Sequence, residues 1–249
     1  MGLVAEEKKS EASYLFPKTY SCPVCDKQFK TLAVRAGKVR NIGQDPDLRP
    51  LFREVDSLKY DAVVCPHCGY AALARYFDNL MPTQKKKIQH EVEETFRGME
   101  MNEEQYSYDE AIMRYKMALK CDKVGEVKNS RKAYTCLKLA WVLRGKLEHE
   151  GKDMLQEERE LLYADEMEYI QSAYNGYKLA FSSEHFPMSG MDEDTLSYLS
   201  AELAYELGQY REALQYIAKI FAKKSISSRL RDKALDLKER IRAKVKSEN

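Results

Sequence analysis

Apolar positions from residue 71 to the end of the chain recur at steps of three and four, with few Gly or Pro residues between them. This period matches the α-helix, in which residues three and four apart share a face. Three segments share a finer pattern, in which a small residue is followed by apolar residues four, seven and eight positions later. They begin at Ala111, Ala173 and Ala213. This pattern is typical of the second helix of a tetratricopeptide repeat, because the small side chain lets that helix pack closely against its partner.

The spacing of these segments is irregular. Ala111 and Ala213 are separated by three lengths of a repeat of about 34 residues, but Ala173 does not fit the same grid. We therefore expect an insertion in the middle unit, at the charged loop 148–158. The first helices of the three units, whose exposed residues would form a binding surface, are expected at 84–99, 130–147 and 195–207. The alternative is a plain antiparallel bundle of amphipathic helices.

Before residue 71 the pattern changes to short apolar and alternating runs, which are typical of strands. We predict strands at 14–20, within 29–40, and at 60–64. Between them, residues 43–50 contain two prolines and two aspartates, Asp45 and Asp47, and predict an irregular loop.

Two Cys-x-x-Cys turns follow the first and the last of these strands. They contain Cys22 and Cys25, and Cys65 and Cys68. Each turn presents two sulfurs on one side, and two such turns complete the tetrahedral shell of a structural zinc ion. Asp26 and Gly69 come directly after the turns, where a positive φ is often needed. We predict Zn²⁺ bound by the four cysteines, with the metal supplying much of the folding free energy. Thioredoxin-like redox chemistry is the alternative, but no βαβ pattern surrounds either turn.

The expected fold is mainly α, with a small β zinc-ribbon-like N-terminal domain followed by a tetratricopeptide-like antiparallel helical array. The expected boundaries are a flexible N-terminus at 1–13, the zinc-ribbon-like domain at 14–78, and the helical domain at 79–249 with a C-terminal capping helix.

The overall composition does not indicate a particular class of binding partner. The 249 residues are 33% charged and carry a net charge of +1, which favours neither nucleic acid nor membrane. The first residues lack the apolar stretch of a secretory signal, and no later segment approaches the length of a membrane span. We therefore expect a cytoplasmic protein with no membrane partner. Cys121 and Cys136 lie in apolar helical patterns and are expected to be buried thiols.

Two stretches are locally charged. Residues 157–168 predict an acidic helix, which we interpret as a solvated face. Residues 223–246 hold ten Lys or Arg against three Asp and Glu, and they keep an apolar stripe at steps of three and four. This pattern favours a capping helix that is apolar inward and basic outward. The alternative is a nucleic-acid interface formed together with Arg35, Lys38 and Arg40 of the predicted ribbon.

Several of these features occur together in a known family. They are the two cysteine turns, Thr31, Arg35, Gly37, Lys38, Asp45-x-Asp47, Tyr60-Asp61, and the Gly-Tyr-Ala sequence after Cys68. The arrangement resembles a bacterial domain-of-unknown-function family whose members pair a zinc-ribbon-like segment with a tetratricopeptide-like region. That family often has Asn-Pro shortly before the tyrosine, where this chain has Asp56 to Lys59. The resemblance implies the architecture but no activity, because none is assigned to the family.

The chain has no Gly-rich phosphate loop, no His-Glu-x-x-His and no Gly-x-Ser-x-Gly, and its four His residues are scattered. Four cysteines would also close the zinc shell, whereas a catalytic zinc keeps an open position. We predict a non-enzymatic adaptor or scaffold that binds an unknown protein or peptide on its helical-repeat surface. The alternatives are a nucleic-acid-binding regulator, and an enzyme acting at the loop of Asp45 and Asp47.

Overall fold

The computed structural model describes residues 10–223 and 225–248. The chain divides into two compact units. Unit 1 comprises the chain up to Gly43 together with Pro50–Gly125, and unit 2 comprises Gln44–Arg49 together with the chain from Glu126 onward. The domain boundaries that we inferred from the sequence remain predictions. Most of the predicted flexible N-terminus lies outside the described residues, and Glu11–Tyr14 form a short 3₁₀ helix, η1.

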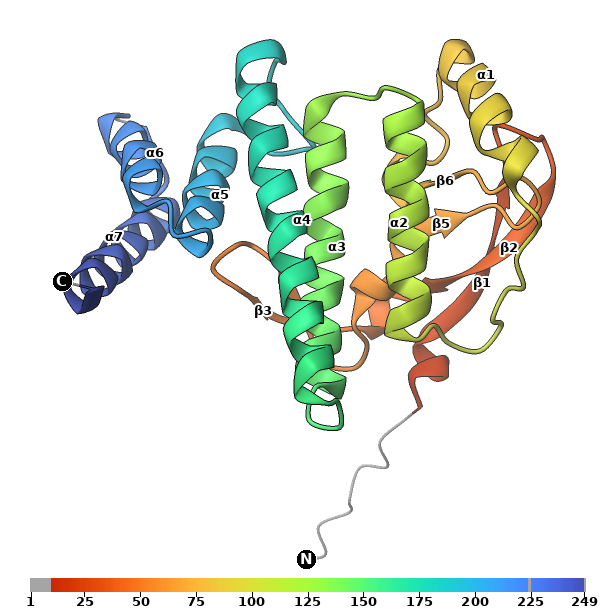
Figure 1. The fold of residues 1–249 in the computed structure, drawn as a ribbon, viewed down its shortest axis with the longest axis horizontal. Helices are drawn as coiled ribbons and strands as arrows, with labels where there is room; N and C mark the ends of the chain where they lie inside the picture. The colour runs from red at the N-terminus through yellow and green to blue at the C-terminus, as the bar shows by residue number, and fades with distance from the viewer. Residues whose placement is uncertain (1–9, 224, 249) are drawn as a thin grey trace, which may run out of the picture. The chain divides into compact units, whose positions relative to one another are not determined.

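The described residues form six short strands and seven α-helices (Figure 1). The strands are β1 Leu15–Ser21, β2 Gln28–Val34, β3 Asn41–Gln44, β4 Pro50–Phe52, β5 Ala62–Val64 and β6 Ala71–Leu73. The helices are α1 Pro82–Glu91, α2 Tyr108–Val124, α3 Asn129–Glu150, α4 Gln156–Ser183, α5 Glu193–Glu206, α6 Tyr210–Ala222 and α7 Ser228–Glu248. The mainly α fold, with small N-terminal hairpins followed by a helical array, is confirmed. None of the described helices combines the length and apolar character that crossing a bilayer requires.

The strands pair as three antiparallel hairpins, β1–β2, β3–β4 and β5–β6. In the first, Leu15 pairs with Val34 and Ser21 with Gln28, so the first cysteine turn closes a regular seven-residue ladder. Strand β6 was missed, because the helical pattern was expected to begin at Ala71. The three residues of β6 are all buried and do not alternate, so the strand carries no periodic signal of its own.

The core of unit 1 gathers aromatic rings beside the cysteine turns. Tyr20, Phe29, Tyr70 and Phe77 pack together with centroid distances of 4.9–6.1 Å, mostly edge to face or tilted. Residues of α1 and α2, including Ile88, complete the same buried cluster. The hairpins of unit 1 therefore share their core with two helices.

Unit 2 is a helical array, in which α3 packs against α4, α5 against α6, and α7 against α5 and α6. Ala173 and Ala213 are completely buried, as their pattern predicts, and so is Ala111 in unit 1. The repeat assignment itself remains a prediction.

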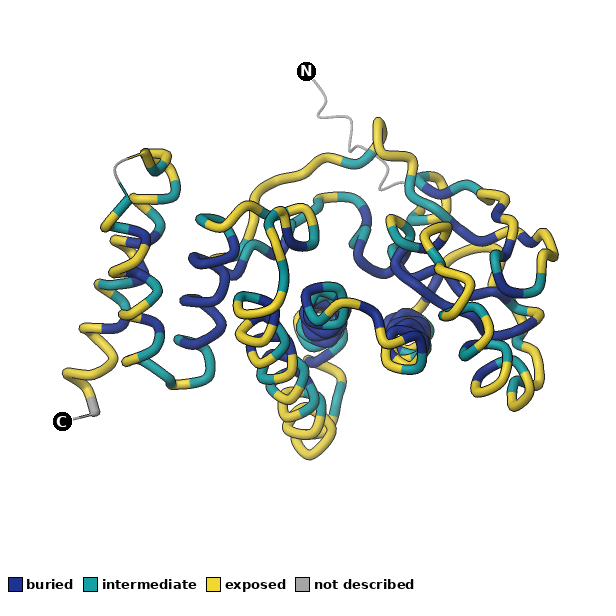
Figure 2. Tube along the Cα trace, turned by 90° about the horizontal axis from the view of Figure 1, so that it is seen from above, coloured by how far each residue is buried: buried dark blue, intermediate teal, exposed yellow. Residues whose placement is uncertain are grey.

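Helix α5 corrects one expectation of the sequence analysis. We expected exposed binding residues at 195–207, but every residue from Leu196 to Ala204 is buried (Figure 2). Helices α4, α6 and α7 contact α5, and Tyr198 donates a hydrogen bond to the Pro46 carbonyl in the segment 44–49. The helix is therefore a core element of unit 2 and not a binding face.

Replacing Ala213 with Leu should lower the free energy of unfolding of unit 2 by about 1–3 kcal/mol, because the closely packed site has no room for the larger side chain. Trp141, the single tryptophan of the chain, is buried in unit 2, so its fluorescence during urea unfolding reports this unit. Leu214→Ala is the matched control, since Leu214 is 39% exposed. Equal losses in the two variants would contradict the packing.

Candidate metal centre

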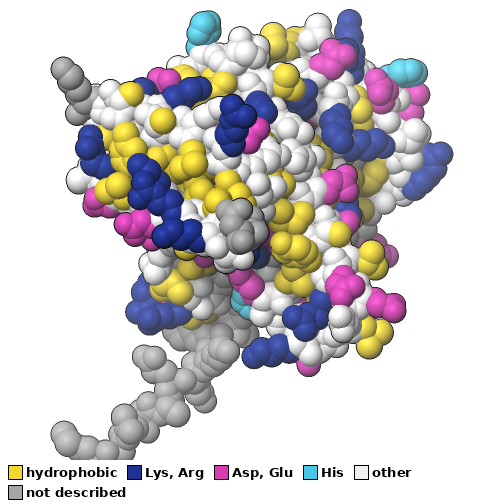
Figure 3. Space-filling view, turned by 60° about the vertical axis from the view of Figure 1, so that its left-hand side comes forward, with side chains coloured by type: hydrophobic (Ala, Val, Ile, Leu, Met, Phe, Trp, Pro, Cys, Tyr) yellow, Lys and Arg dark blue, Asp and Glu magenta, His cyan; other side chains and the backbone are white. Residues whose placement is uncertain are grey.

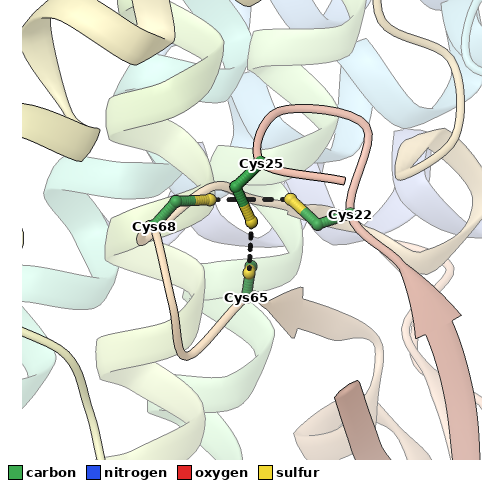
Figure 4. Close-up of side chains that lie close together, drawn as sticks. All are labelled: Cys22, Cys25, Cys65 and Cys68. Carbon is green, nitrogen blue, oxygen red and sulfur yellow. Dashed lines mark hydrogen bonds between the residues drawn. The ribbon is translucent and has the colours of Figure 1, made fainter. Parts of the chain in front are cut away.

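The four predicted cysteines come together in unit 1 (Figure 4). Cys22 and Cys25 lie in the β1–β2 turn, and Cys65 and Cys68 in the β5–β6 turn. All four sulfurs lie within 4.8 Å of one another, with 3.5 Å between Cys22 and Cys68 and 3.7 Å between Cys25 and Cys65. Four sulfurs at about 2.3 Å from a tetrahedral ion would be about 3.8 Å apart, whereas a disulfide is about 2.05 Å long. The cluster therefore has the spacing of a four-sulfur metal shell, and it can hold a metal ion.

The two turns have the same backbone conformation. The amides of Cys22 and Cys65 donate to the carbonyls five residues later, Lys27 and Tyr70, over 3.0 and 2.8 Å. Their carbonyls accept from the amides four residues later, those of Asp26 and Gly69, over 2.9 and 3.0 Å. Asp26 has φ 59° and Gly69 has φ 74°, so the predicted positive φ is confirmed in both turns.

Gly69 is also required for steric reasons. A Cβ atom at this position would lie 2.6 Å from the ring of Phe96. Asp26 has the same backbone conformation, which Asp tolerates. The two turns therefore adopt the same positive-φ conformation with different residues, Asp26 in the first turn and Gly69 in the second.

Hydrogen bonds in the turns favour thiolates. Backbone amides of Val24 and Cys25 donate to the Cys22 sulfur, and those of His67 and Cys68 donate to the Cys65 sulfur. Among the thiols, hydrogen bonds from Cys22 and Cys68 lower the pKa of Cys65. Hydrogen bonding within the cluster raises the pKa of Cys22 and of Cys68. The four thiols therefore do not all ionise readily on their own, and a bound cation would stabilise their thiolates.

Cys121 of α2 lies behind the second turn and outside the four-sulfur cluster. Its sulfur accepts a hydrogen bond from the Ala71 amide at 3.3 Å and lies 3.8 Å from the Gly69 carbonyl oxygen. Cys121 and Cys136 are both buried and outside any disulfide, as predicted. The sequence did not indicate that Cys121 supports the turn, because that contact joins residues 50 positions apart.

The predicted loop of Asp45 and Asp47 lies in unit 2, where both carboxylates are held by arginines. Asp47 is completely buried and accepts hydrogen bonds from Trp141 Nε1 at 2.7 Å and Arg144 Nη1 at 2.9 Å. Asp45 forms an ion pair with Arg49. The two aspartates could be identified from the sequence, but their partners could not, because the Asp47 contacts join residues more than 90 positions apart.

Arg144 binds more carboxylates than its charge can balance. Besides Asp47, its guanidinium donates to Glu166 at 2.6 Å and to Glu206 at 3.0 Å. Burial, together with the charge of Asp47, raises the pKa of Glu206 to about 8, and burial also raises the pKa of Glu166. One guanidinium facing three carboxylates thus leaves Glu206 largely protonated at neutral pH.

This arrangement predicts a pH-dependent gain for Glu206→Gln. A carboxyl group with a folded pKa near 8 contributes stability that is complete below its unfolded pKa, about 4.3, and lost as the pH rises through about 8. Gln preserves the neutral form. Its advantage over wild type in urea unfolding, followed by Trp141 fluorescence, should therefore grow by on the order of 1–3 kcal/mol between about pH 5.5 and about pH 8.5.

Glu148→Gln is the control for that measurement, because Glu148 pairs with Arg49 and is half-exposed. A difference between Glu206→Gln and wild type that stays constant with pH would contradict the crowding of carboxylates on Arg144.

Comparison with known proteins identifies the family of this chain. Residues 15–241 match the family described as "Uncharacterized protein conserved in bacteria (DUF2225)". No curated protein and no solved structure matches the chain. The match includes both cysteine turns and nearly all of the helical region, so the resemblance inferred from the motifs is confirmed. The chain belongs to this uncharacterised bacterial family.

Proposed function

We propose that this protein is a non-enzymatic adaptor, in which a structural Zn²⁺ ion binds the four cysteines and the helices of unit 2 bind a protein or peptide. The observation that carries the proposal is the four-sulfur cluster. Soft thiolate ligands in a tetrahedral arrangement suit zinc. Cys22, Cys25, Cys65 and Cys68 would fill every coordination position, which leaves none for a substrate.

The surroundings of Asp45 and Asp47 support a binding role over a catalytic one. Both carboxylates are paired with arginines. A pocket of about 440 Å³ near this loop is lined by Gln44 and Leu48, but neither aspartate contributes to it. These carboxylates therefore have structural partners in place of a substrate site.

Exposed apolar side chains on α4 support partner binding by unit 2. Leu161 and Leu179 are both more than half exposed, and apolar side chains on a helix surface are the usual anchors of protein interfaces. The predicted basic surface of the ribbon has less support, because Arg40 pairs with Glu54 and Arg35 donates to the Leu15 carbonyl. A tetratricopeptide-like array and a cytoplasmic location, where thiols stay reduced, are parts of this proposal.

Metal analysis of the purified chain should find about one zinc per chain, as a single four-sulfur site requires. Cys25→Ser and Cys68→Ser should each lose the metal and make unit 1 sensitive to proteolysis, because binding free energy is folding free energy at such a site. Cys136→Ser, a buried cysteine in unit 2, is the matched control and should keep the zinc. The zinc assignment would be contradicted by a purified wild-type chain that contains no metal and still resists protease.

Affinity capture from a nuclease-treated bacterial lysate tests the adaptor role. Wild type should retain a specific protein, and Leu179→Glu should retain about tenfold less, because an apolar anchor contributes on the order of 1.5–3 kcal/mol. Gln215→Glu adds the same charge at an exposed position of a different helix of unit 2, α6, and should retain as much as wild type.

Filter binding to DNA and RNA at two salt concentrations provides the opposing outcome. Tight binding with a steep salt dependence, combined with no specific protein capture, would replace the adaptor by a nucleic-acid-binding function.

A further inference from the structure

The free end of the α3–α4 hairpin exposes large apolar side chains. Leu155, Leu161 and Tyr163 are 71%, 70% and 57% exposed, and in Figure 2 the beginning of α4 is almost entirely yellow. A surface helix normally buries such residues against its own domain. These side chains leave apolar area open to a partner, and Leu161 and Tyr163 lie on different sides of α4, because residues two positions apart do not share a helix face.

This end of the hairpin is also acidic. Residues 146–168 contain nine Asp or Glu against three Lys or Arg. One pocket of about 520 Å³ has Met154 and Leu161 in its wall, with Asp153 and Glu158 beside them. A second pocket, of about 450 Å³, is lined by Leu147 and Tyr163 together with Glu160. The acidic end, defined as residues 146–168, thus combines apolar pockets with a negatively charged rim.

Helix α7 of the same chain has the complementary character. Residues 228–246 contain eight Lys or Arg against three Asp or Glu. Ala234, Leu237 and Ile241 are buried, which confirms the predicted inward apolar stripe. Leu235 is 45% exposed, and the exposed Arg231 and Arg242 lie four and seven residues from it.

These three residues define the outer face of α7, because such spacings place side chains on one side of a helix. The space-filling view toward α6 and α7 shows Lys and Arg side chains beside hydrophobic ones (Figure 3). Lys238 lies on the same side, three residues from Leu235, and so do the exposed Asp232 and Glu239, three and four residues from it. The outer face is therefore a mixed surface with a small excess of positive charge and one exposed apolar residue.

We propose that the outer face of α7 docks on the acidic end of a second copy of this chain. Charge complementarity selects this occupant. A nucleic acid would account for the outer face of α7 alone, and a basic partner protein would account for the acidic end alone. A second copy accounts for both, in a chain whose total charge is only +1.

Within unit 2, the helices that carry the two surfaces pack against other helices. We therefore assign the contact between the two surfaces to a second molecule. Helix α7 packs on α5 and α6, and α3 packs on α4. If two copies exchange α7 contacts about a twofold axis, each contact is made twice and the assembly closes as a dimer. The proposal goes beyond the adaptor role and does not depend on it.

Sedimentation velocity of the purified full-length, zinc-loaded chain tests the contact. Wild type should associate with increasing concentration at about 50 mM salt and much less at about 500 mM salt, because exposed charges are then screened. Arg242→Glu should weaken association about tenfold, as expected when one close charge pair turns repulsive. Leu161→Asn should weaken it at both salt concentrations.

A further variant reverses a charge on the acidic end. Asp153→Arg should weaken association at low salt, as Arg242→Glu does, because it places a positive charge on the rim that the outer face of α7 would contact. Glu91→Arg, at an exposed position of α1, controls for charge reversal elsewhere and should behave as wild type. Trp141 fluorescence verifies that unit 2 has folded in each variant, and far-UV circular dichroism verifies the helical content of the whole chain.

Three results would overturn the proposal. The first is a wild-type chain that stays monomeric at both salt concentrations, and the second is association that none of the α7 or acidic-end variants changes. The third is a monomer that sediments faster only when DNA or RNA is added, which would assign the outer face of α7 to nucleic acid. Lysate capture by the Leu179→Glu variant measures binding of another protein and does not depend on self-association. The adaptor proposal and the self-association proposal can therefore fail separately.

Discussion

The four-sulfur cluster is the constraint on which unit 1 depends. It joins two hairpins whose cysteines, Cys25 and Cys65, are 40 residues apart in sequence. The β5–β6 ladder has only three residue pairs, and hairpins of this size are marginal in water by themselves. Their turns bring four thiols to within 4.8 Å, a distance at which thiolates repel one another unless a cation lies between them. A metal bound to these cysteines and the fold of the two turns would therefore depend on each other.

An aromatic core stabilises unit 1 in addition to the cysteine cluster. Tyr20, Phe29, Tyr70 and Phe77 pack directly behind the turns, and α2 covers the β5–β6 hairpin. Tyr115 of α2 donates a hydrogen bond to the Leu58 carbonyl. Apolar burial thus stabilises the region of the cysteine cluster and includes residues of two helices of unit 1.

Unit 2 fixes the segment 44–49 in a different way, with buried charge. Asp47 is held by Trp141 and Arg144, and Arg144 also binds Glu166 and Glu206. A buried ion pair contributes little net stability compared with apolar packing, but breaking it leaves an uncompensated charge. We interpret this network as a device that selects one position for the segment within unit 2.

The sequence predicted those parts whose signals are local. The cysteine turns were identified by their spacing and by Asp26 and Gly69, and the helices by their period. The rest depends on tertiary contacts. Strand β6 is too short to show a period, and α5 lacks an exposed face because other elements surround it. The role of Arg144 could not be predicted from the helical pattern, because its carboxylate partners lie 22 to 97 positions away in sequence.

X-ray absorption at the zinc edge tests the central claim most directly, because it reports the atoms bound to the metal in the intact chain. A structural four-cysteine site predicts a shell of four sulfurs at about 2.3 Å with no nitrogen or oxygen neighbour. A shell containing a water, histidine or carboxylate ligand would contradict it, since the metal would then have an open or different site and the adaptor proposal would lose its support.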